Sequence, residues 1–321
     1  MKSDKILVIL EKHEDIAKEA INLLYNEGFE LFFLESSNQI FNDRRIKYAE
    51  AILVRGATIS KNIIEYMPNL KIVARSGVGI DNIDIDAATK SNVHVCNVPE
   101  ANFISVAEHV LGMILTLSHQ IIPGNTFVRQ GVFDARYQFV GRELLGKTVG
   151  IIGFGKVGKM VSQMCVYGFN MNVLVYDPFI KNQDMLKIQF VDSPEVIYKK
   201  SDYITLHLPY TSKLHHFIGE KELLKMKESA YIINCARGGL IDEIALVKAL
   251  KNGDIAGAGI DVYEEEPPTK NHILWDVEKV VATPHMGAST SESLSRMALG
   301  AAEEIIRVLN QESTKNSINL I

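Results

Sequence analysis

The sequence has few cysteines, and this limits the kinds of site it can form. Cys96, Cys165 and Cys235 are odd in number and far apart. That pattern argues against a disulfide framework or a zinc site, and it fits a reducing compartment. We therefore expect a cytoplasmic protein that holds no metal.

Positive charge and long apolar runs are also scarce. Lysine and arginine number 34 against 39 acidic residues, for a net charge of −5, so no global basic field is present to hold nucleic acid or an anionic membrane. The first apolar run, Ile6–Leu10, is too short for a membrane span or a signal sequence. We expect neither nucleic acid nor a membrane as a partner, and an anionic ligand would have to meet local positive charge.

What the sequence does contain is an alternation of strand-like apolar runs and helical patterns, which predicts parallel sheets covered by helices on both faces. Its 321 residues are enough for two such domains. The expected strands are Ile6–Leu10, Leu31–Leu34, Ala51–Val54, Ile72–Ala74, Val93–Cys96, Thr148–Ile152, Asn172–Tyr176, Tyr203–Leu206, Tyr231–Cys235, Gly257–Val262 and Lys279–Ala282. The expected helices are Asp15–Asn26, Lys61–Met67, Ile104–Ser118, Lys156–Tyr167 and Glu292–Asn310.

The pattern of apolar and polar residues changes near residue 102. Ser105 and Glu108 have the spacing of a capping box ahead of an apolar stretch, which predicts that a long buried helix starts there and ends near Ser118. The stretch that follows, Pro123–Gly146, shows no regular pattern and is expected to be irregular. From pattern alone the chain divides into two domains in series near residues 99–102.

A glycine-rich motif marks the start of the second series. Gly153, Gly155 and Gly158 form G-x-G-x-x-G directly after an apolar strand and directly before a helix. The first glycine permits a tight turn, the second lets the backbone approach a pyrophosphate, and the third lets helix and strand pack closely. The helix N-terminus would then face the phosphates. The motif predicts a dinucleotide site; a glycine turn that binds another phosphate, or nothing, is the alternative.

The identity of the dinucleotide is indicated by Asp177, at the end of the next strand. A carboxylate there accepts hydrogen bonds from the ribose hydroxyls and repels a 2′-phosphate. No arginine follows it directly. The sequence therefore favours NAD over NADP.

Arg237 lies on a turn where a strand ends and a helix begins, with Asp242 as the expected N-cap. Ligands bind at the carboxyl ends of strands in open α/β sheets. The adjacent Gly238 and Gly239 allow close approach, and a guanidinium there suits a carboxylate. An arginine paired with a surface acid is the alternative.

Two further segments could supply a general base, His285, and a carboxylate that pairs with it, Glu266. Glu266 precedes two prolines, and His285 follows a strand and a proline. A solvated acidic loop and a structural histidine are the alternatives. If Glu266 reaches His285, the carboxylate favours the charged imidazole and fixes its tautomer. Hydride transfer from a 2-hydroxy acid needs one base and one cation, which His285 and Arg237 would supply to a small anionic 2-hydroxy or 2-oxo acid.

Many blocks in order give the chain a resemblance to the D-isomer-specific 2-hydroxyacid dehydrogenases over nearly its whole length. The blocks are VRGAT (54–58), RSGVGIDNID (75–84), ANFISVAEHVLG (101–112), GKTVGIIGFGKVG (146–158), HLP (207–209), INCARGGLIDE (233–243), GIDVYEEEPP (259–268) and TPHMGAST (283–290).

This resemblance implies a discontinuous α/β fold of two doubly wound parallel-sheet domains. A Rossmann NAD-binding domain, residues 102–288, would be inserted in a flavodoxin-like substrate domain formed by residues 1–101 and 289–321. That revises the simple division in series. The resemblance also implies a homodimer with helix Ile104–Ser118 at its interface.

The resemblance further implies roles for individual residues. Arg237, Glu266 and His285 would be catalytic. NAD would be bound by Val78, Gly153, Gly155, Lys156, Val157, Gly158, Asp177, His207, Leu208, Pro209, Cys235, Ala236, Asp261, His285, Gly287 and Ala288. Substrate would be bound by Arg55, Arg75, Ser76, Gly77, Arg136 and Arg237, with Arg136 supplied by the partner subunit and the loop at 76–79 offering backbone N–H groups.

Within the family the chain resembles most the branch that oxidises D-3-phosphoglycerate to 3-phosphohydroxypyruvate, the first step of serine biosynthesis. Arg55, Arg75 and Arg136 match positions that collect positive charge for the phosphate; structural ion pairs are the alternative for the first two. The chain lacks the C-terminal regulatory domains of many such enzymes, so inhibition by serine is not expected. The other possibilities are a hydroxypyruvate or glyoxylate reductase, another D-2-hydroxyacid dehydrogenase, and an NAD(H)-sensing corepressor.

Overall fold

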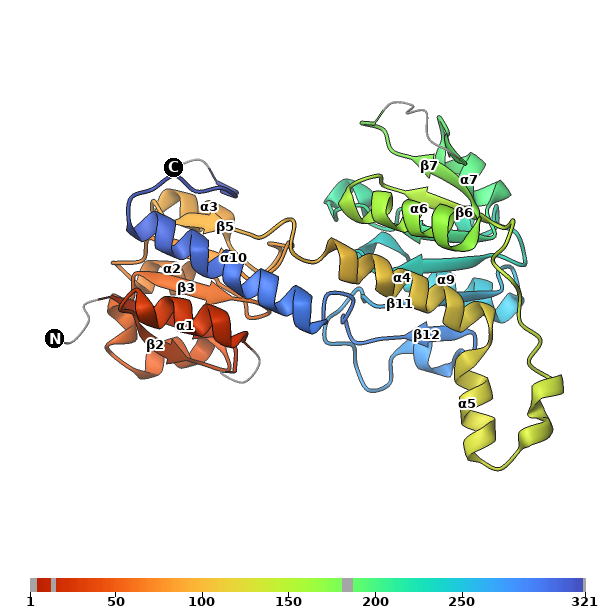
Figure 1. The fold of residues 1–321 in the computed structure, drawn as a ribbon, viewed down its shortest axis with the longest axis horizontal. Coiled ribbons are helices and arrows are strands. Elements are labelled where there is room, and N and C mark those ends of the chain that lie inside the picture. The colour runs from red at the N-terminus through yellow and green to blue at the C-terminus, as the bar shows by residue number, and fades with distance from the viewer. Residues whose placement is uncertain (1–4, 13–15, 181–186, 320–321) are drawn as a thin grey trace. The chain divides into compact units, whose positions relative to one another are not determined.

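Two parallel β-sheets organise the chain, as the computed structural model in Figure 1 shows. The structure describes residues 5–12, 16–180 and 187–319. It divides into two units, one formed by Met1–Asn102 with Ala288–Ile321 and the other by Phe103–Gly287. Among the described helices none is long and apolar enough to cross a membrane.

The first unit contains a five-stranded sheet in the order β2-β1-β3-β4-β5, with every pair parallel. This is the flavodoxin-like strand order. The strands are β1 (Ile6–Leu10), β2 (Glu30–Phe33), β3 (Ala51–Val54), β4 (Ile72–Arg75) and β5 (His94–Cys96). The helices are α1 (Lys18–Asn26), α2 (Lys61–Tyr66), α3 (Ile85–Lys90) and α10 (Ser291–Leu309), with 3₁₀ turns at Ser37–Asn42 and Ile46–Tyr48.

Helices cover both faces of this sheet because its strands are apolar on both faces. In β1, Leu7 and Ile9 pack with α1 and α10, whereas Val8 and Leu10 pack with α2 and α3. A strand buried on both faces reads as a continuous apolar run. The structure thus confirms the prediction that the apolar run Ile6–Leu10 is a strand of a parallel sheet.

The second unit contains a seven-stranded parallel sheet in the order β12-β11-β10-β9-β6-β7-β8. This is the Rossmann order with one additional strand, β12. The strands are β6 (Thr148–Ile152), β7 (Asn172–Tyr176), β8 (Ile188–Phe190), β9 (Tyr203–Leu206), β10 (Tyr231–Asn234), β11 (Gly257–Ile260) and β12 (Val280–Ala282).

Helices α4 (Phe103–Ser118) and α6 (Lys156–Phe169) pack on one face of that sheet, and α7 (Pro194–Lys200), α8 (Glu220–Leu223) and α9 (Glu243–Asn252) pack on the other. The remaining helical segments are α5 (Ile121–Arg129) and 3₁₀ turns at Phe133–Tyr137, Ser212–Leu214, Gly238–Leu240 and Ile273–Asp276. The predicted fold class, two doubly wound parallel-sheet units, is confirmed.

Several local predictions were wrong. Helix α4 begins at Phe103, so Ser105 lies buried in its first turn instead of capping it. The stretch after α4 contains α5, a helix in which no residue is buried. Pro123 and Gly124 within it read as helix breakers in the sequence. The pattern also missed α3, β8, α7 and α8. Asp15, the expected start of α1, lies outside the described residues, and α1 begins at Lys18.

The C-terminal segment is bound to the edge strand β5 of the first unit. Asn319 is buried; its Oδ1 accepts from the Val95 N–H at 2.8 Å. Its Nδ2 donates to the Val93 carbonyl at 2.9 Å and to Thr89 Oγ1 at 3.1 Å. One side chain thus satisfies three polar groups at a sheet edge more than 200 residues away in sequence.

We expect Asn319→Ala to destabilise the first unit by about 2–4 kcal/mol, because it leaves the buried Val95 N–H and Val93 carbonyl unpaired. Urea unfolding would be followed by far-ultraviolet circular dichroism and by the fluorescence of Trp275, the single tryptophan, which lies in the second unit. The circular-dichroism transition of the first unit should move to a lower urea concentration, while the fluorescence transition of Trp275 in the second unit should stay where it is. Exposed Ser313→Ala is the matched control, and equal stability of both variants would contradict the assignment.

Candidate active site

The glycine motif forms a tight turn at the end of β6. Gly153 has φ of +96°, and a Cβ there would lie 2.6 Å from the His207 carbonyl oxygen. A side chain is therefore excluded by both conformation and space. The same approach brings the backbone of His207, Leu208 and Pro209 next to the glycine turn.

The other two glycines differ in what surrounds them. A Cβ on Gly158 would lie 2.2 Å from the Gly153 carbonyl oxygen, so α6 packs on the turn only with glycine there. A Cβ on Gly155 would meet nothing within 4 Å. Gly155 is the N-cap of the 14-residue α6, whose first residues are Lys156 and Val157. An open backbone at a helix N-terminus fits a pyrophosphate.

Asp177 directly follows β7 and holds the glycine turn in place. Its Oδ2 accepts from the Phe154 N–H at 2.8 Å, and its Oδ1 accepts from the Phe179 N–H at 2.9 Å. Each carboxylate oxygen can accept a second hydrogen bond. The carboxylate thus lies beside the turn, where its predicted ribose contact requires it.

His207 follows β9 and contributes its backbone and a neutral ring. Its N–H donates to the Ile152 carbonyl at 2.7 Å, and its Nε2 lies 3.2 Å from Thr205 Oγ1. Burial lowers the pKa of His207 to about 3. This histidine therefore carries no charge toward a dinucleotide at neutral pH.

The buried Asp261, directly after β11, organises the loop that carries His285. Its Oδ1 accepts from Thr283 Oγ1 at 2.6 Å and from the Met286 N–H at 2.8 Å, and its Oδ2 accepts from the Gly287 N–H at 2.9 Å. Its carbonyl accepts from the His285 N–H at 2.8 Å. Burial by itself would raise the pKa of Asp261, but these bonds together with His109 outweigh it and hold the pKa below its usual range.

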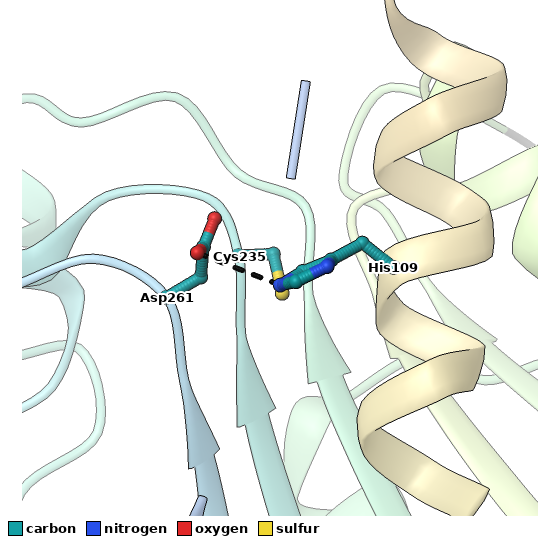
Figure 2. A group of neighbouring side chains, drawn as sticks. All are labelled: His109, Cys235 and Asp261. Atoms are coloured by element: carbon teal, nitrogen blue, oxygen red, sulfur yellow. Dashed lines mark ion pairs between the residues drawn. The ribbon is translucent and has the colours of Figure 1, made fainter. Parts of the chain in front are cut away.

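Figure 2 shows His109, from the middle of α4, close to Cys235 and Asp261, which directly follow β10 and β11. His109 Nε2 lies 3.5 Å from Asp261 Oδ1, and the Cys235 thiol donates to Met113 Sδ at 3.6 Å. Burial, followed by the charge of Asp261, raises the pKa of Cys235 well above its usual range. Metal binding needs a thiolate and available carboxylate oxygens. A protonated thiol and a carboxylate already bonded to the loop make this cluster a poor fit for a metal ion or a nucleophile.

The structure brings Glu266 and His285 together. Glu266 Oε2 lies 2.6 Å from His285 Nδ1, and Glu266 Oε1 accepts from the Tyr263 N–H at 3.1 Å. With Nδ1 engaged by the carboxylate, Nε2 is the ring nitrogen left to meet a ligand. His285 has φ of +51° and its side chain is 51% exposed, so the ring is held by the loop and not by burial.

The carboxyl group of Glu266 stays ionised to low pH. Burial by itself would raise its pKa, but the His285 hydrogen bond and charge, the Tyr263 N–H and the charge of Arg237 outweigh burial and lower it. The stabilisation from the ionised Glu266 carboxylate is therefore present above its usual pKa of 4.5 and is lost only as pH falls through the lowered value.

Gly238 sets the distance between the Arg237 turn and the Glu266 loop. A Cβ on Gly238 would lie 1.8 Å from the Tyr263 carbonyl oxygen, so only glycine lets the two segments touch. Asp242 caps α9 as predicted, accepting from the Ala245 N–H at 3.0 Å. The charge of Arg237 thereby acts directly on Glu266.

The first unit contains two of the other predicted arginines, Arg55 and Arg75. Arg55 Nη1 pairs with Glu11 Oε1 at 3.1 Å, and Arg55 Nη2 donates to Ser289 Oγ at 3.1 Å. Arg75 Nη1 donates to the Ser76 carbonyl at 2.5 Å. The Arg55–Glu11 pair matches the structural ion pair that the sequence left open as the alternative to phosphate binding by Arg55.

Two backbone N–H groups of the loop at 76–79, which was predicted to bind the substrate carboxylate, already donate hydrogen bonds within the protein. The Ser76 N–H donates to the Val54 carbonyl at 2.8 Å, and the Gly77 N–H donates to the Arg75 carbonyl at 2.9 Å. The Val78 carbonyl accepts from Asn97 Nδ2 at 2.7 Å. Substrate or cofactor roles for these residues stay predictions, and the two committed N–H groups favour side-chain over backbone recognition.

Arg136 lies apart from these groups, on the exposed 3₁₀ turn at Phe133–Tyr137. Its guanidinium lies over the Phe133 and Tyr137 rings at 4.9 and 4.7 Å from their centroids, and its Nη2 donates to the Tyr137 hydroxyl at 2.6 Å. Within one chain it therefore contacts none of the three predicted catalytic residues.

Two residues that support the site were missed by the sequence analysis. His109 on α4 reaches Thr283 Oγ1 at 3.0 Å, and the buried Tyr263 donates its hydroxyl to the Thr283 carbonyl at 2.8 Å. Both contacts join segments far apart in sequence, and His109 sits in an apolar helix pattern that indicates packing only. No local signal pointed to either.

Comparison with known proteins agrees with this geometry. The family described as "D-isomer specific 2-hydroxyacid dehydrogenase, NAD binding domain" matches residues 111–287. The D-3-phosphoglycerate dehydrogenase of Methanocaldococcus jannaschii is 41% identical over 98% of the chain. The hydroxypyruvate reductase of Thermotoga maritima is 38% identical over 92% of the chain and 97% of its own length.

Solved structures show the same architecture. The D-lactate dehydrogenase of Escherichia coli, in its apo form, is 28% identical with a TM-score of 0.85, covering 98% of this chain and all of its own. The chain spans only 59% of the M. jannaschii protein and 51% of the Bacillus subtilis D-3-phosphoglycerate dehydrogenase, which is 42% identical.

The glycine geometry predicts opposite defects for two substitutions. Gly155→Ala should fold normally, because its Cβ meets open space, yet bind NADH roughly tenfold or more weakly, because the methyl group holds the pyrophosphate away. Gly158→Ala should lower the thermal midpoint, because its Cβ collides with the turn. Fluorescence titration with NADH and thermal unfolding separate the two, and a stable Gly158→Ala protein with full NADH affinity would contradict the account.

Proposed function

Because this chain belongs to the D-isomer-specific 2-hydroxyacid dehydrogenase family, we propose that it oxidises a small anionic D-2-hydroxy acid with NAD. The pairing of Glu266 with His285 at 2.6 Å carries the proposal. It supplies an oriented general base in the same unit as the glycine turn and Asp177. NAD, when bound, would accept the hydride from the carbinol carbon.

His285 removes the hydroxyl proton in this mechanism. Glu266 accepts from Nδ1, so the neutral ring presents Nε2 as the proton acceptor, and the ionised Glu266 stabilises the imidazolium that forms. In the reverse direction His285 returns the proton to the developing alkoxide. The low pKa of Glu266 keeps this arrangement intact throughout the neutral range.

Arg237 binds the substrate carboxylate in this mechanism. A planar guanidinium donates two parallel hydrogen bonds to a carboxylate, and the turn at the end of β10 places the residue at the ligand-binding edge of the sheet. The charge of Arg237 helps to lower the pKa of Glu266, the partner of His285. We therefore propose that the cation Arg237 and the base His285 act on the same substrate molecule.

We infer further that the substrate is D-3-phosphoglycerate, with product 3-phosphohydroxypyruvate, as at the start of serine biosynthesis. The D-3-phosphoglycerate dehydrogenase relatives near 40% identity support this. The hydroxypyruvate reductase relative of similar length supports the alternative. Because Arg55 is paired with Glu11, we propose that Arg75 and Arg136 supply more of the phosphate recognition.

A homodimer would bring Arg136 to a second site. Apolar side chains are exposed along residues 121–145 of the second unit, and a protein surface seldom leaves so many apolar groups uncovered together. They are Ile121, Ile122, Val128, Val132, Phe133, Tyr137, Val140 and Leu145. We propose that a second copy of the chain covers them and that Arg136, within this segment, reaches the substrate of that copy.

His285→Ala should lower kcat by a factor of roughly 10³ or more while NADH binding stays within about twofold, because only the proton acceptor is lost. Glu266→Gln should lower kcat/KM about tenfold or more, because a neutral amide no longer stabilises the imidazolium that forms during proton transfer. Steady-state kinetics against pH measure both. Wild-type rates in His285→Ala would remove this residue as the base.

Substrate identity is tested by NADH oxidation, with NADPH in parallel, against phosphohydroxypyruvate, hydroxypyruvate, glyoxylate, 2-oxoglutarate and pyruvate. We expect the phosphorylated acid to give the highest kcat/KM, and Arg136→Ala to lower that value roughly tenfold or more while changing the others little. A higher kcat/KM for hydroxypyruvate would select the reductase. Tight NADH binding with no turnover would select a sensor.

Co-expression of His285→Ala with Arg136→Ala provides the control for the dimer. If the partner supplies Arg136, a mixed dimer contains one site with both residues intact and regains turnover of the phosphorylated acid. Arg136→Ala alone and His285→Ala alone set the baselines. A mixture no better than their sum would place Arg136 in its own chain's site or outside any site.

A further inference from the structure

His109 projects from α4 toward Asp261, as Figure 2 shows, and the proposed reaction leaves this contact without a role. Its side chain is only 19% exposed. We propose that His109 is a positioning residue that fixes the 283–287 loop and, through it, His285. The proposal rests on the proposed function for its kinetic consequence, but its structural part does not.

The direction of the hydrogen bonds among His109, Thr283 and Asp261 follows from the single proton of the Thr283 hydroxyl. The Thr283 hydroxyl lies 2.6 Å from Asp261 Oδ1, and an ionised carboxylate only accepts. The single Thr283 proton therefore goes to Asp261, and the Thr283 oxygen is left to accept from His109 Nε2 at 3.0 Å. His109 must donate from Nε2, so the chain of donors runs from His109 to Thr283 to Asp261.

The end of this chain is the group that holds the His285 loop. Asp261 receives the N–H groups of Met286 and Gly287 on its side chain and that of His285 on its carbonyl. These three bonds enclose a residue with φ of +51°, a conformation that side chains disfavour and that persists only where surroundings enforce it. A displaced Asp261 would release that constraint.

A donor from α4 matters because the chain of hydrogen bonds ends on a buried carboxylate, while Thr283 and His109 are partly buried. Asp261 is 1% exposed, and a buried acceptor that loses a donor is strongly disfavoured. An apolar replacement of His109 would leave Thr283 Oγ1 without its donor. Glutamine places an amide N–H at about the reach of Nε2, so it tests the donor separately from the ring.

We would compare His109→Leu and His109→Gln with His119→Leu, an exposed histidine just beyond the same helix. The readouts are kcat, KM, the NADH dissociation constant and the His285 ring signals in a ¹H–¹³C spectrum, assigned with His285→Ala. His109→Leu should lower kcat roughly tenfold or more and shift the His285 signals. His109→Gln should recover most of both, and His119→Leu should change neither.

Three outcomes would overturn the proposal. The first is His109→Leu with wild-type kcat and unmoved His285 signals. The second is equal loss in the Leu and Gln variants with a lowered thermal midpoint, which would make His109 a residue of the fold. The third is an altered NADH dissociation constant with unmoved His285 signals. A wild-type protein that turns over no 2-oxo acid would refute the proposed function, while the ring signals would still test His109.

Discussion

The parallel pairing of β10, β11 and β12 is the constraint on which the candidate site depends. Asn234 is level with Ile260, and Ile260 is level with Ala282, so three segments leave the sheet at one edge. Parallel strands present all their carboxyl ends together. Arg237 and His285 both lie beyond this edge because of the register, although 48 positions separate the two residues in sequence.

Beyond the strand ends, close contacts and one buried carboxylate set the distances. Gly238 lets the Arg237 turn touch Tyr263, whose N–H then orients Glu266. Asp261 gathers the His285 loop with four hydrogen bonds. The half-exposed His285 ring has little packing of its own, so its orientation comes from Glu266 and from the loop beneath it.

Charge is distributed unevenly among the residues expected to recognise an anion. Arg237 acts on Glu266, Arg55 is paired with Glu11, and Arg136 lies on an exposed segment with apolar neighbours. In the proposed reaction, hydride and proton transfer would need only groups of the second unit. Selectivity for a phosphorylated acid would need additional arginines that are not already neutralised by an acidic partner such as Glu11.

The sequence by itself determined the fold class and the glycine turn, because strand burial and turn glycines leave local patterns. It also named Arg237, Glu266 and His285 as candidates, from their places after strands and from the family resemblance. The helix α5 was missed because Pro123 and Gly124 interrupt its apolar residues, and no residue of it is buried. Only the tertiary structure decided that Glu266 contacts His285, that Arg55 pairs with Glu11, and that His109 supports Asp261. Each of these contacts joins segments remote in sequence, and their distances follow from sheet register and packing, which no local pattern encodes.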